Sequence, residues 1–228
     1  MLQQPIATTH GELKLWDLTT MKEVHIQGHY HPTYSIALSP DGKLVAAATT
    51  VASHFQPTYS EVRIWDANTG RLLKTLKRQG HGNMVQEVAF SPNGETLATS
   101  WRLEVPANEK DPEISDVLLW DVATWKSRTV PRANFLAFTP DGKVVFTTDG
   151  HDVRLWGSAT ERKWAVLRDS KSYNGVSTLS LDGKKLAKAC GLQNGRPQDP
   201  YFGPANFGPK DCTIGVWDLT KLLEQKRD

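Results

Sequence analysis

The 228-residue sequence predicts an all-β protein made of four-stranded units that recur along the chain. Two short patterns support this prediction. A polar turn ending in Gly occurs four times, within "SPDGK", "SPNGE", "TPDGK" and "SLDGK". A second pattern is built around Trp and occurs five times, as "LKLWD", "VRIWD", "VLLWD", "VRLWG" and "IGVWD". The two patterns alternate in a fixed order, which indicates repeated structural units rather than unrelated hairpins.

The Gly-ended turn joins the first two strands of each unit, called strands a and b. Pro, then Asp or Asn, then Gly at successive positions favour a tight turn, because each residue suits the backbone angles found there. Strand-like segments flank the first two copies. "SIALS" and "KLVAAAT" lie on either side of the turn at Gly42, and "EVAFS" and "TLATS" on either side of the turn at Gly94.

The Trp pattern predicts the third strand of each unit, strand c. Its residues alternate with a period of two and include many β-branched side chains, which is typical of strands. A polar turn such as "DANTGR" follows and leads into a short strand d. We expect the Trp side chains to be structural, packing in the core and between units. They are Trp16, Trp65, Trp120, Trp156 and Trp217.

These patterns resemble the WD-repeat β-propeller family, in the form common among bacterial members, and the resemblance covers nearly the whole chain. It implies one β-propeller domain over residues 1–228, an arc of four full four-stranded blades plus a partial first blade. The family places a Gly-His pair before strand a, which implies structural roles for His29 and His81. The implied blades are 1–27 (partial), 28–78, 79–130, 131–168 and 169–220, followed by a short helical tail at 221–228.

The resemblance also implies a ring that is incomplete at its N-terminus. The chain begins near strand b of a blade and ends after a strand c. Rings of this family close when the N-terminal strand becomes strand d of the last blade. Open faces on the first and last blades would then expose apolar residues such as Leu13 and Leu15. Because exposed apolar patches mark interfaces, self-association is predicted.

Three of the four loops between strands b and c are long. Compared with the third full blade, the others carry 9, 12 and 20 extra residues. In the family these loops share one face of the disc, and repeat proteins place insertions on the binding face. The aromatic side chains of the loops either anchor a partner or fold back onto their own loops. The candidate partner-binding residues are His54, Phe55, Tyr59, Trp101, Arg102, Arg196, Tyr201, Phe202 and Phe207.

Composition and motifs narrow the function. The balance of 27 basic against 25 acidic residues gives no footprint for nucleic acid or a membrane surface. The sequence lacks the common catalytic and phosphate-binding motifs, and of the pair His29 and His31 one belongs to the Gly-His element. No catalytic residue, cofactor or metal is therefore expected. The sequence predicts a non-catalytic scaffold that binds a protein or peptide. The alternative is a small-molecule-sensing or enzymatic propeller with a pocket at the channel mouth.

The two cysteines, Cys190 and Cys212, bracket the longest insert. They lie at the end of a strand b and just before a strand c, where cross-strand neighbours come within reach of a disulfide. The alternative is a reduced pair in a cytosolic protein. A bonded pair would indicate an exported protein, whereas free thiols would indicate the cytoplasm, which is slightly favoured.

Overall fold

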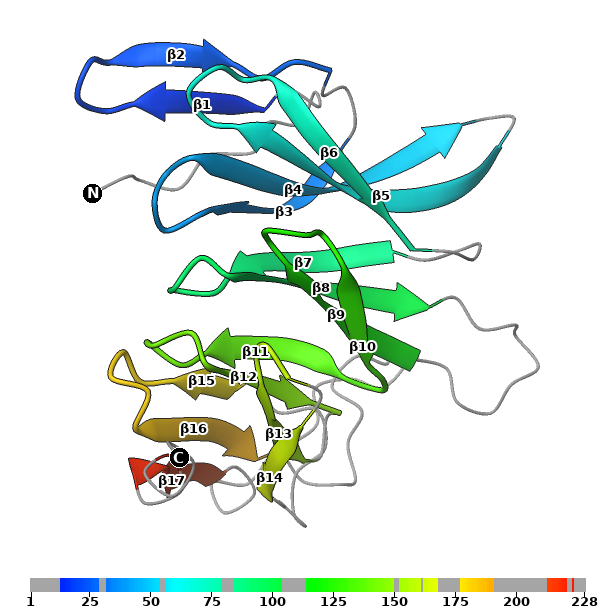
Figure 1. Cartoon of the computed structure of the whole chain (residues 1–228). Helices are drawn as coiled ribbons and strands as arrows, with labels where there is room; N and C mark the ends of the chain where they lie inside the picture. The colour runs from blue at the N-terminus through cyan, green and yellow to red at the C-terminus, as the bar shows by residue number, and fades with distance from the viewer. Residues whose placement is uncertain are drawn as a thin grey trace, which may run out of the picture. The chain divides into compact units, whose positions relative to one another are not determined.

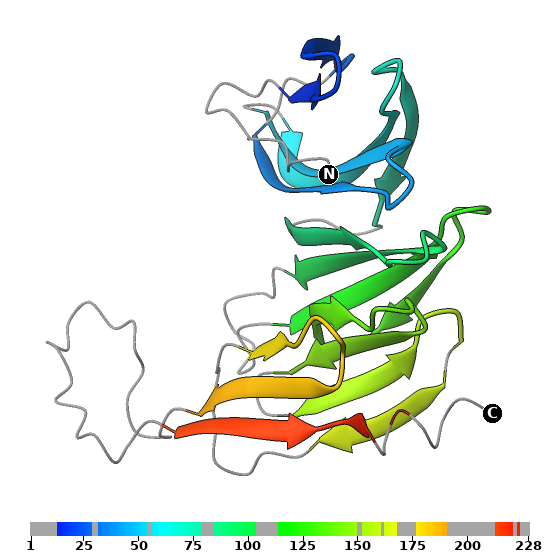
Figure 2. The same ribbon diagram turned by 90° about the vertical axis from the view of Figure 1, so that its left-hand side faces the viewer.

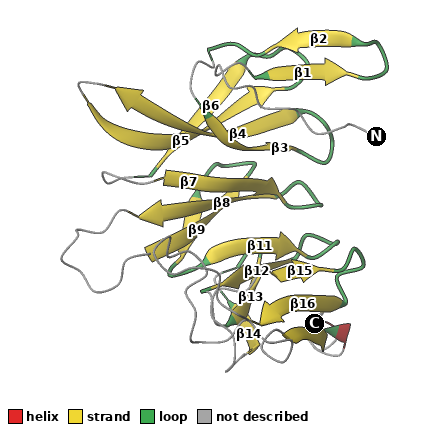
Figure 3. Cartoon of the chain, turned by 180° about the vertical axis from the view of Figure 1, so that it is seen from behind, coloured by secondary structure: helices red, strands yellow, loops and turns green. Residues whose placement is uncertain are grey.

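The computed structural model (Figure 1) describes residues 13–28, 32–53, 56–78, 84–103, 114–149, 152–160, 162–167, 177–190, 213–220 and 223. The chain divides into two compact units, Met1–Phe135 and Leu136–Asp228, and each is described by itself. Nearly all described segments are strands or the turns that join them (Figure 3). The prediction of an all-β fold is confirmed.

The first unit contains one two-stranded and two four-stranded antiparallel sheets. Each four-stranded sheet follows chain order, so neighbouring strands are joined as hairpins, which is the predicted a-to-d arrangement. The strands are β1 (Lys14–Asp17) and β2 (Lys22–His25), then β3 (Thr33–Leu38), β4 (Leu44–Ser53), β5 (Gln56–Asp66) and β6 (Leu72–Lys77), then β7 (Met84–Phe90), β8 (Thr96–Leu103), β9 (Ile114–Asp121) and β10 (Ser127–Val130).

The second unit contains a four-stranded sheet and a three-stranded sheet (Figure 2). The described residues of the last blade form three strands, which correspond to strands a, b and c of the predicted unit. All five Trp patterns lie in the predicted strand c, namely β1, β5, β9, β13 and β17. The strands are β11 (Asn134–Phe138, beginning just before the unit boundary), β12 (Val144–Thr148), β13 (Val153–Gly157) and β14 (Lys163–Leu167), then β15 (Ser177–Leu179), β16 (Lys185–Cys190) and β17 (Thr213–Asp218).

The predicted helical tail is described only at its start. The backbone N–H of Leu223 donates to the carbonyl of Leu219 over 2.9 Å, the spacing of one helical turn. Most of residues 221–228 lies outside the described residues.

The recurring turn is held by its first and third residues. In the first copy, the Ser39 hydroxyl accepts the N–H of Leu44 (2.9 Å) and donates to Oδ1 of Asp41 (2.7 Å). Oδ1 of Asp41 also accepts the N–H of Lys43 (3.1 Å). Gly42 has a φ of 70°, a left-handed conformation that favours glycine. The other three copies repeat these bonds, with Asn93 in the place of Asp in one of them.

These turns predict how stability depends on pH. The Ser39 hydroxyl and the Lys43 N–H lower the pKa of Asp41, and the Ser180 hydroxyl does the same for Asp182. A lowered folded-state pKa contributes stability that is present above the unfolded value and is lost as pH falls through the folded value. We therefore expect an Asp41→Asn/Asp182→Asn variant to lose less thermal stability than wild type between about pH 5 and pH 2.

The copy of the turn that carries Asn93 as its third residue supplies the matched control. Asn93 accepts the same two hydrogen bonds as Asp41, so the Asn substitutions should be tolerated at neutral pH. The reverse change, Asn93→Asp, should steepen the loss of thermal midpoint in acid. Parallel acid profiles for wild type and both variants would contradict this account.

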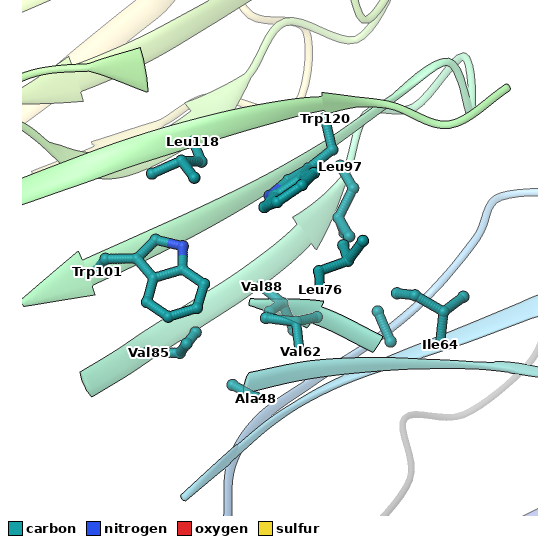
Figure 4. Packing of buried hydrophobic residues seen from close by; sticks show 11 residues of the cluster. Ala48, Val62, Ile64, Leu76, Val85, Val88, Leu97, Trp101, Leu118 and Trp120 are labelled. Carbon is teal, nitrogen blue, oxygen red and sulfur yellow. The ribbon is translucent and has the colours of Figure 1, made fainter. Parts of the chain in front are cut away.

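Alternate residues of strand c face two different neighbouring sheets. Trp65 is fully buried with Leu13 and Leu15 of the β1–β2 sheet, whereas Val62 and Ile64 are fully buried against the sheet of β7 to β10. Figure 4 shows this second cluster. The motif Trp therefore faces the preceding sheet, and the residues one and three positions before it face the following sheet. In the second unit the core lies between the sheets of β13 and β16.

The prediction that Leu13 and Leu15 are exposed is wrong, because they are 5% and 8% exposed. Leu13 and Leu15 stand three positions and one position before Trp16, so they face the following sheet. That sheet, formed by β3 to β6, covers them. Within β1 and β17, the exposed apolar residues are instead Trp16 (48%), whose position corresponds to that of Trp65, and in the second unit Ile214 (74%) and Val216 (62%).

Candidate functional site

One edge of the first unit gathers the ends of strands that lead into the predicted inserts. The β4–β5 hairpin and the facing ends of β8 and β9 extend to the same side (Figure 1). We call this edge the loop face. It is formed by the ends of β4, β6, β8 and β10 and by the starts of β3, β5, β7 and β9.

The structure describes three of the nine predicted partner-binding residues. Tyr59 lies in β5, where its backbone pairs with Val51. Arg102 is exposed near the end of β8, within the loop face. Trp101 precedes it and is fully buried. His54, Phe55, Arg196, Tyr201, Phe202 and Phe207 lie outside the described residues, as do the predicted structural residues His29 and His81.

Trp101 is a core residue, and its prediction as a partner contact is wrong. It belongs to the same face of β8 as Leu97 and Thr99, which points at the sheet of β3 to β6 (Figure 4). Its Nε1–H donates to Oγ1 of Thr99 over 2.7 Å. The alternation that starts at Leu97 could have shown this, since residues two apart in a strand share a face.

The hydroxyl of Thr99 joins two indole rings. It accepts Nε1–H of Trp101 and also Nε1–H of Trp120, the latter over 2.9 Å, and it donates to the carbonyl of Leu118. A hydroxyl offers two acceptor positions and one donor, so all three are used.

The other motif tryptophans differ in burial and partner. Nε1–H of Trp65 donates to the carbonyl of Gln27 (2.8 Å), and Nε1–H of Trp156 donates to Oγ1 of Thr147 (3.0 Å). Trp217 is half-buried and lies over Gly215, where an added Cβ would stand 2.6 Å from the indole. Trp16 is half-exposed.

Two buried carboxylates, Glu61 and Asp116, form ion pairs with basic side chains near the loop face. Glu61 is 2% exposed, and its Oε1 lies 2.5 Å from Nε of Arg63 while its Oε2 lies 3.3 Å from Nζ of Lys77. Nη1 of Arg63 also donates to the carbonyl of Gly28, which ties β5 to the end of the preceding connection. The carboxylate is thus paired on both oxygens, as a buried charge requires.

The second carboxylate, Asp116, connects the two four-stranded sheets of the first unit. Its Oδ2 accepts Nη2–H of Arg78 over 2.6 Å, and Arg78 directly follows β6 of the other sheet. Its Oδ1 accepts the backbone N–H of Arg132 over 2.9 Å. Arg132 has a φ of 49°, which is uncommon for a residue other than glycine. Nη1 of Arg78 is buried and has no hydrogen-bond acceptor among the described residues.

Tyr34 is an exposed aromatic residue that the sequence did not single out. The pairing of β3 with β4 shifts between Thr33 and Ser35, so Tyr34 bulges from the ladder, and it is 57% exposed. Gln86 occupies the same bulge position in β7 and is also exposed. Bulges redirect side chains. The turn fixes where strand a lies, but no sequence pattern marks the bulge.

The structure describes only one of the two cysteines predicted to form a disulfide. Cys190 ends β16, where its backbone pairs with Thr213. Cys212, the residue before Thr213, lies outside the described residues, as does most of the longest insert. The disulfide and the cellular location that depends on it stay predictions.

Two features are absent from the ranges that the structure describes. Across those ranges, His, Cys, Asp and Glu side chains do not gather in threes that could hold a metal ion. The same ranges contain no helix with the length and apolar character that a membrane span requires.

Comparison with known proteins supports the repeat architecture. The family model "WD domain, G-beta repeat" matches residues 21–66 and 70–101. The nuclear distribution protein PAC1 of Arthroderma benhamiae is 29% identical over 208 residues, which cover 90% of this chain and 35% of that protein. The small ribosomal subunit protein RACK1y of rice is 27% identical over 154 residues, covering 63% of this chain and 40% of that protein.

The fold is also found among solved structures. Hydrazine synthase of Kuenenia stuttgartiensis superposes with a TM-score of 0.59 and 16% identity, covering 91% of this chain and 66% of that chain. At this identity the likeness concerns the fold alone. The chain spans less than half the length of the curated relatives compared above. In its two recurring patterns, its four-stranded sheets and these matches, the chain is similar to proteins of the WD40-repeat β-propeller family.

Proposed function

We propose that this chain is a non-catalytic scaffold module that binds a protein or peptide through its loop face. The relatives give coarse support, since repeats of this kind occur in proteins such as RACK1y, which is named as part of a ribosomal subunit. The proposal that the loop face is the binding surface is supported by side chains that the strands hold at that edge.

The observation that carries the proposal is Tyr34. An exposed aromatic ring at a strand bulge is preorganised for contact, because the ladder on both sides fixes its backbone. Tyrosine buries a large apolar area and keeps a polar tip, which explains its enrichment at interfaces. Arginines, also enriched at interfaces, flank the same edge at Arg102 and Arg132.

The experiment that tests the loop face uses peptides selected from a random display library on the immobilised protein. Their binding to wild type is compared with binding to Tyr34→Ala. Leu73→Ala is the matched control, because Leu73 is a comparably exposed side chain on β6. We expect Tyr34→Ala to weaken selected peptides by about tenfold or more, about 1.4 kcal/mol, and Leu73→Ala to change little. Equal binding by all three proteins would refute the assignment of this face.

The alternative is a small-molecule-sensing or enzymatic propeller. If it is correct, the binding of the selected peptides should not depend on Tyr34. Self-association through the terminal faces also stays a prediction, now placed on Trp16 in the first unit and on Ile214 and Val216 in the second.

A further inference from the structure

We infer that Asn93 is a site of chemical modification, whose side-chain amide is lost by deamidation when the turn that contains it opens. The site is independent of the proposed binding function. Asn is a chemically labile residue, and Asn93 is exposed and precedes Gly94, which has no side chain to hinder attack by its backbone nitrogen. The other three copies of the turn carry Asp at this position, as Asp41, Asp141 and Asp182.

The reaction uses the backbone nitrogen of Gly94 as the nucleophile. This nitrogen bonds to Cγ of Asn93 while the bond from Cγ to Nδ2 breaks, and Nδ2 leaves as ammonia with the proton that Gly94 gives up. The product is a five-membered succinimide ring. Water then opens the ring. Cleavage of the newly formed bond gives Asp, whereas cleavage of the original peptide bond gives isoaspartate, in which the main chain runs through Cγ.

The folded turn restrains both reacting groups. Oδ1 of Asn93 accepts the Ser91 hydroxyl (2.6 Å) and the N–H of Glu95 (3.2 Å), and Nδ2 donates to Oε2 of Glu95 (2.9 Å). The N–H of Gly94 donates to the carbonyl of Ser91 over 2.8 Å. Attack requires that the Gly94 nitrogen be released and that the Asn93 side chain turn towards it. These bonds must therefore break first, so deamidation requires local opening of the turn.

The two products differ in how well they fit the turn. Asp fits, because Oδ1 of Asp41 accepts the Ser39 hydroxyl and the Lys43 N–H in the first copy. Only the bond from Nδ2 to Glu95 is then lost. Isoaspartate lengthens the main chain by one carbon before Gly94, so the hydrogen bond that closes the turn cannot form with the same geometry. We therefore expect the isoaspartyl product to leave the turn open.

The test follows deamidation of the full-length protein in mildly alkaline buffer by mass spectrometry. Trypsin releases residues 79–102 as one peptide, and its Asn, Asp and isoaspartyl forms are separated by chromatography and assigned by fragmentation. A synthetic peptide of the same residues, incubated in parallel, is the reference without a folded turn. We expect Asn93 to deamidate about tenfold or more slowly in the folded protein than in this peptide.

Two serine variants show whether this particular turn controls the reaction. Ser91→Ala removes the hydroxyl that donates to Asn93 and accepts the N–H of Thr96. Ser39→Ala is the matched control, because it removes the equivalent hydroxyl from the first copy. We expect Ser91→Ala to speed deamidation of Asn93 about tenfold and Ser39→Ala to change it by less than about twofold. If Ser91→Ala does not fold, Glu95→Ala takes its place with a smaller increase.

The isoaspartyl form supplies a second measurement. The N–H of Val122 donates to the carbonyl of Glu95 over 2.9 Å, so its amide hydrogen exchange should be faster in that form than in wild type. Three results would overturn the inference. The first is an equal rate of deamidation in the folded protein and the peptide. The second is an effect of Ser91→Ala no larger than that of Ser39→Ala, which would trace the reaction to global unfolding. The third is a peptide in which Asn93 does not deamidate.

Discussion

Replacing Thr99 with Val should lower the free energy of unfolding by about 2–6 kcal/mol, because each buried donor left unpaired costs about 1–3 kcal/mol. Valine keeps the shape of threonine but removes the acceptor shared by Trp101 and Trp120. Both indole N–H groups would then be buried without a partner. The change is measured by denaturant unfolding, and the two indole N–H resonances should shift in NMR spectra.

Thr147 provides a matched control for this prediction. Its hydroxyl accepts one indole N–H, that of Trp156, over 3.0 Å. Thr147→Val should therefore cost about 1–3 kcal/mol, half of the loss expected for Thr99→Val. The shared-acceptor explanation fails if Thr147→Val proves as destabilising as Thr99→Val, or if the Trp101 and Trp120 resonances do not move.

The second large effect is expected at Gly70, where alanine should destabilise the first unit by about 2–5 kcal/mol. Gly70 has a φ of 68°, so any Cβ is strained there. An added Cβ would also stand 1.9 Å from the carbonyl oxygen of His25, at the end of β2. That oxygen belongs to the backbone and cannot rotate away. The β1–β2 sheet would have to separate from the turn between β5 and β6.

Gly94 separates the two causes of this loss. Its φ is 75°, but an added Cβ would meet nothing closer than Cδ of Pro40 at 3.8 Å. Gly94→Ala should therefore show the backbone strain alone, about 1–2 kcal/mol. Denaturant midpoints compare the two variants, and amide hydrogen exchange in β1 and β2 should rise in Gly70→Ala alone. Equal losses in both variants would rule out the clash with His25.

The sequence by itself determined the strand pattern, the recurring turn and the position of Trp in strand c. These features depend on residues close together in the chain. The hydroxyl and carboxylate of Ser39 and Asp41 close their own turn, and the period-two alternation of "VRIWD" already assigns its residues to two faces of a strand.

Only the tertiary structure decided which of those faces is covered, and by what. Leu13 is buried against the sheet of β3 to β6, whereas Trp16, three residues later on the other face, is half-exposed. Trp101 is buried because the face of β8 that it shares with Leu97 packs against the sheet of β3 to β6. Asp116 and Arg78 meet across a separation of 38 residues. Local patterns cannot predict such partners, since they depend on how whole sheets stack rather than on the residues of one strand.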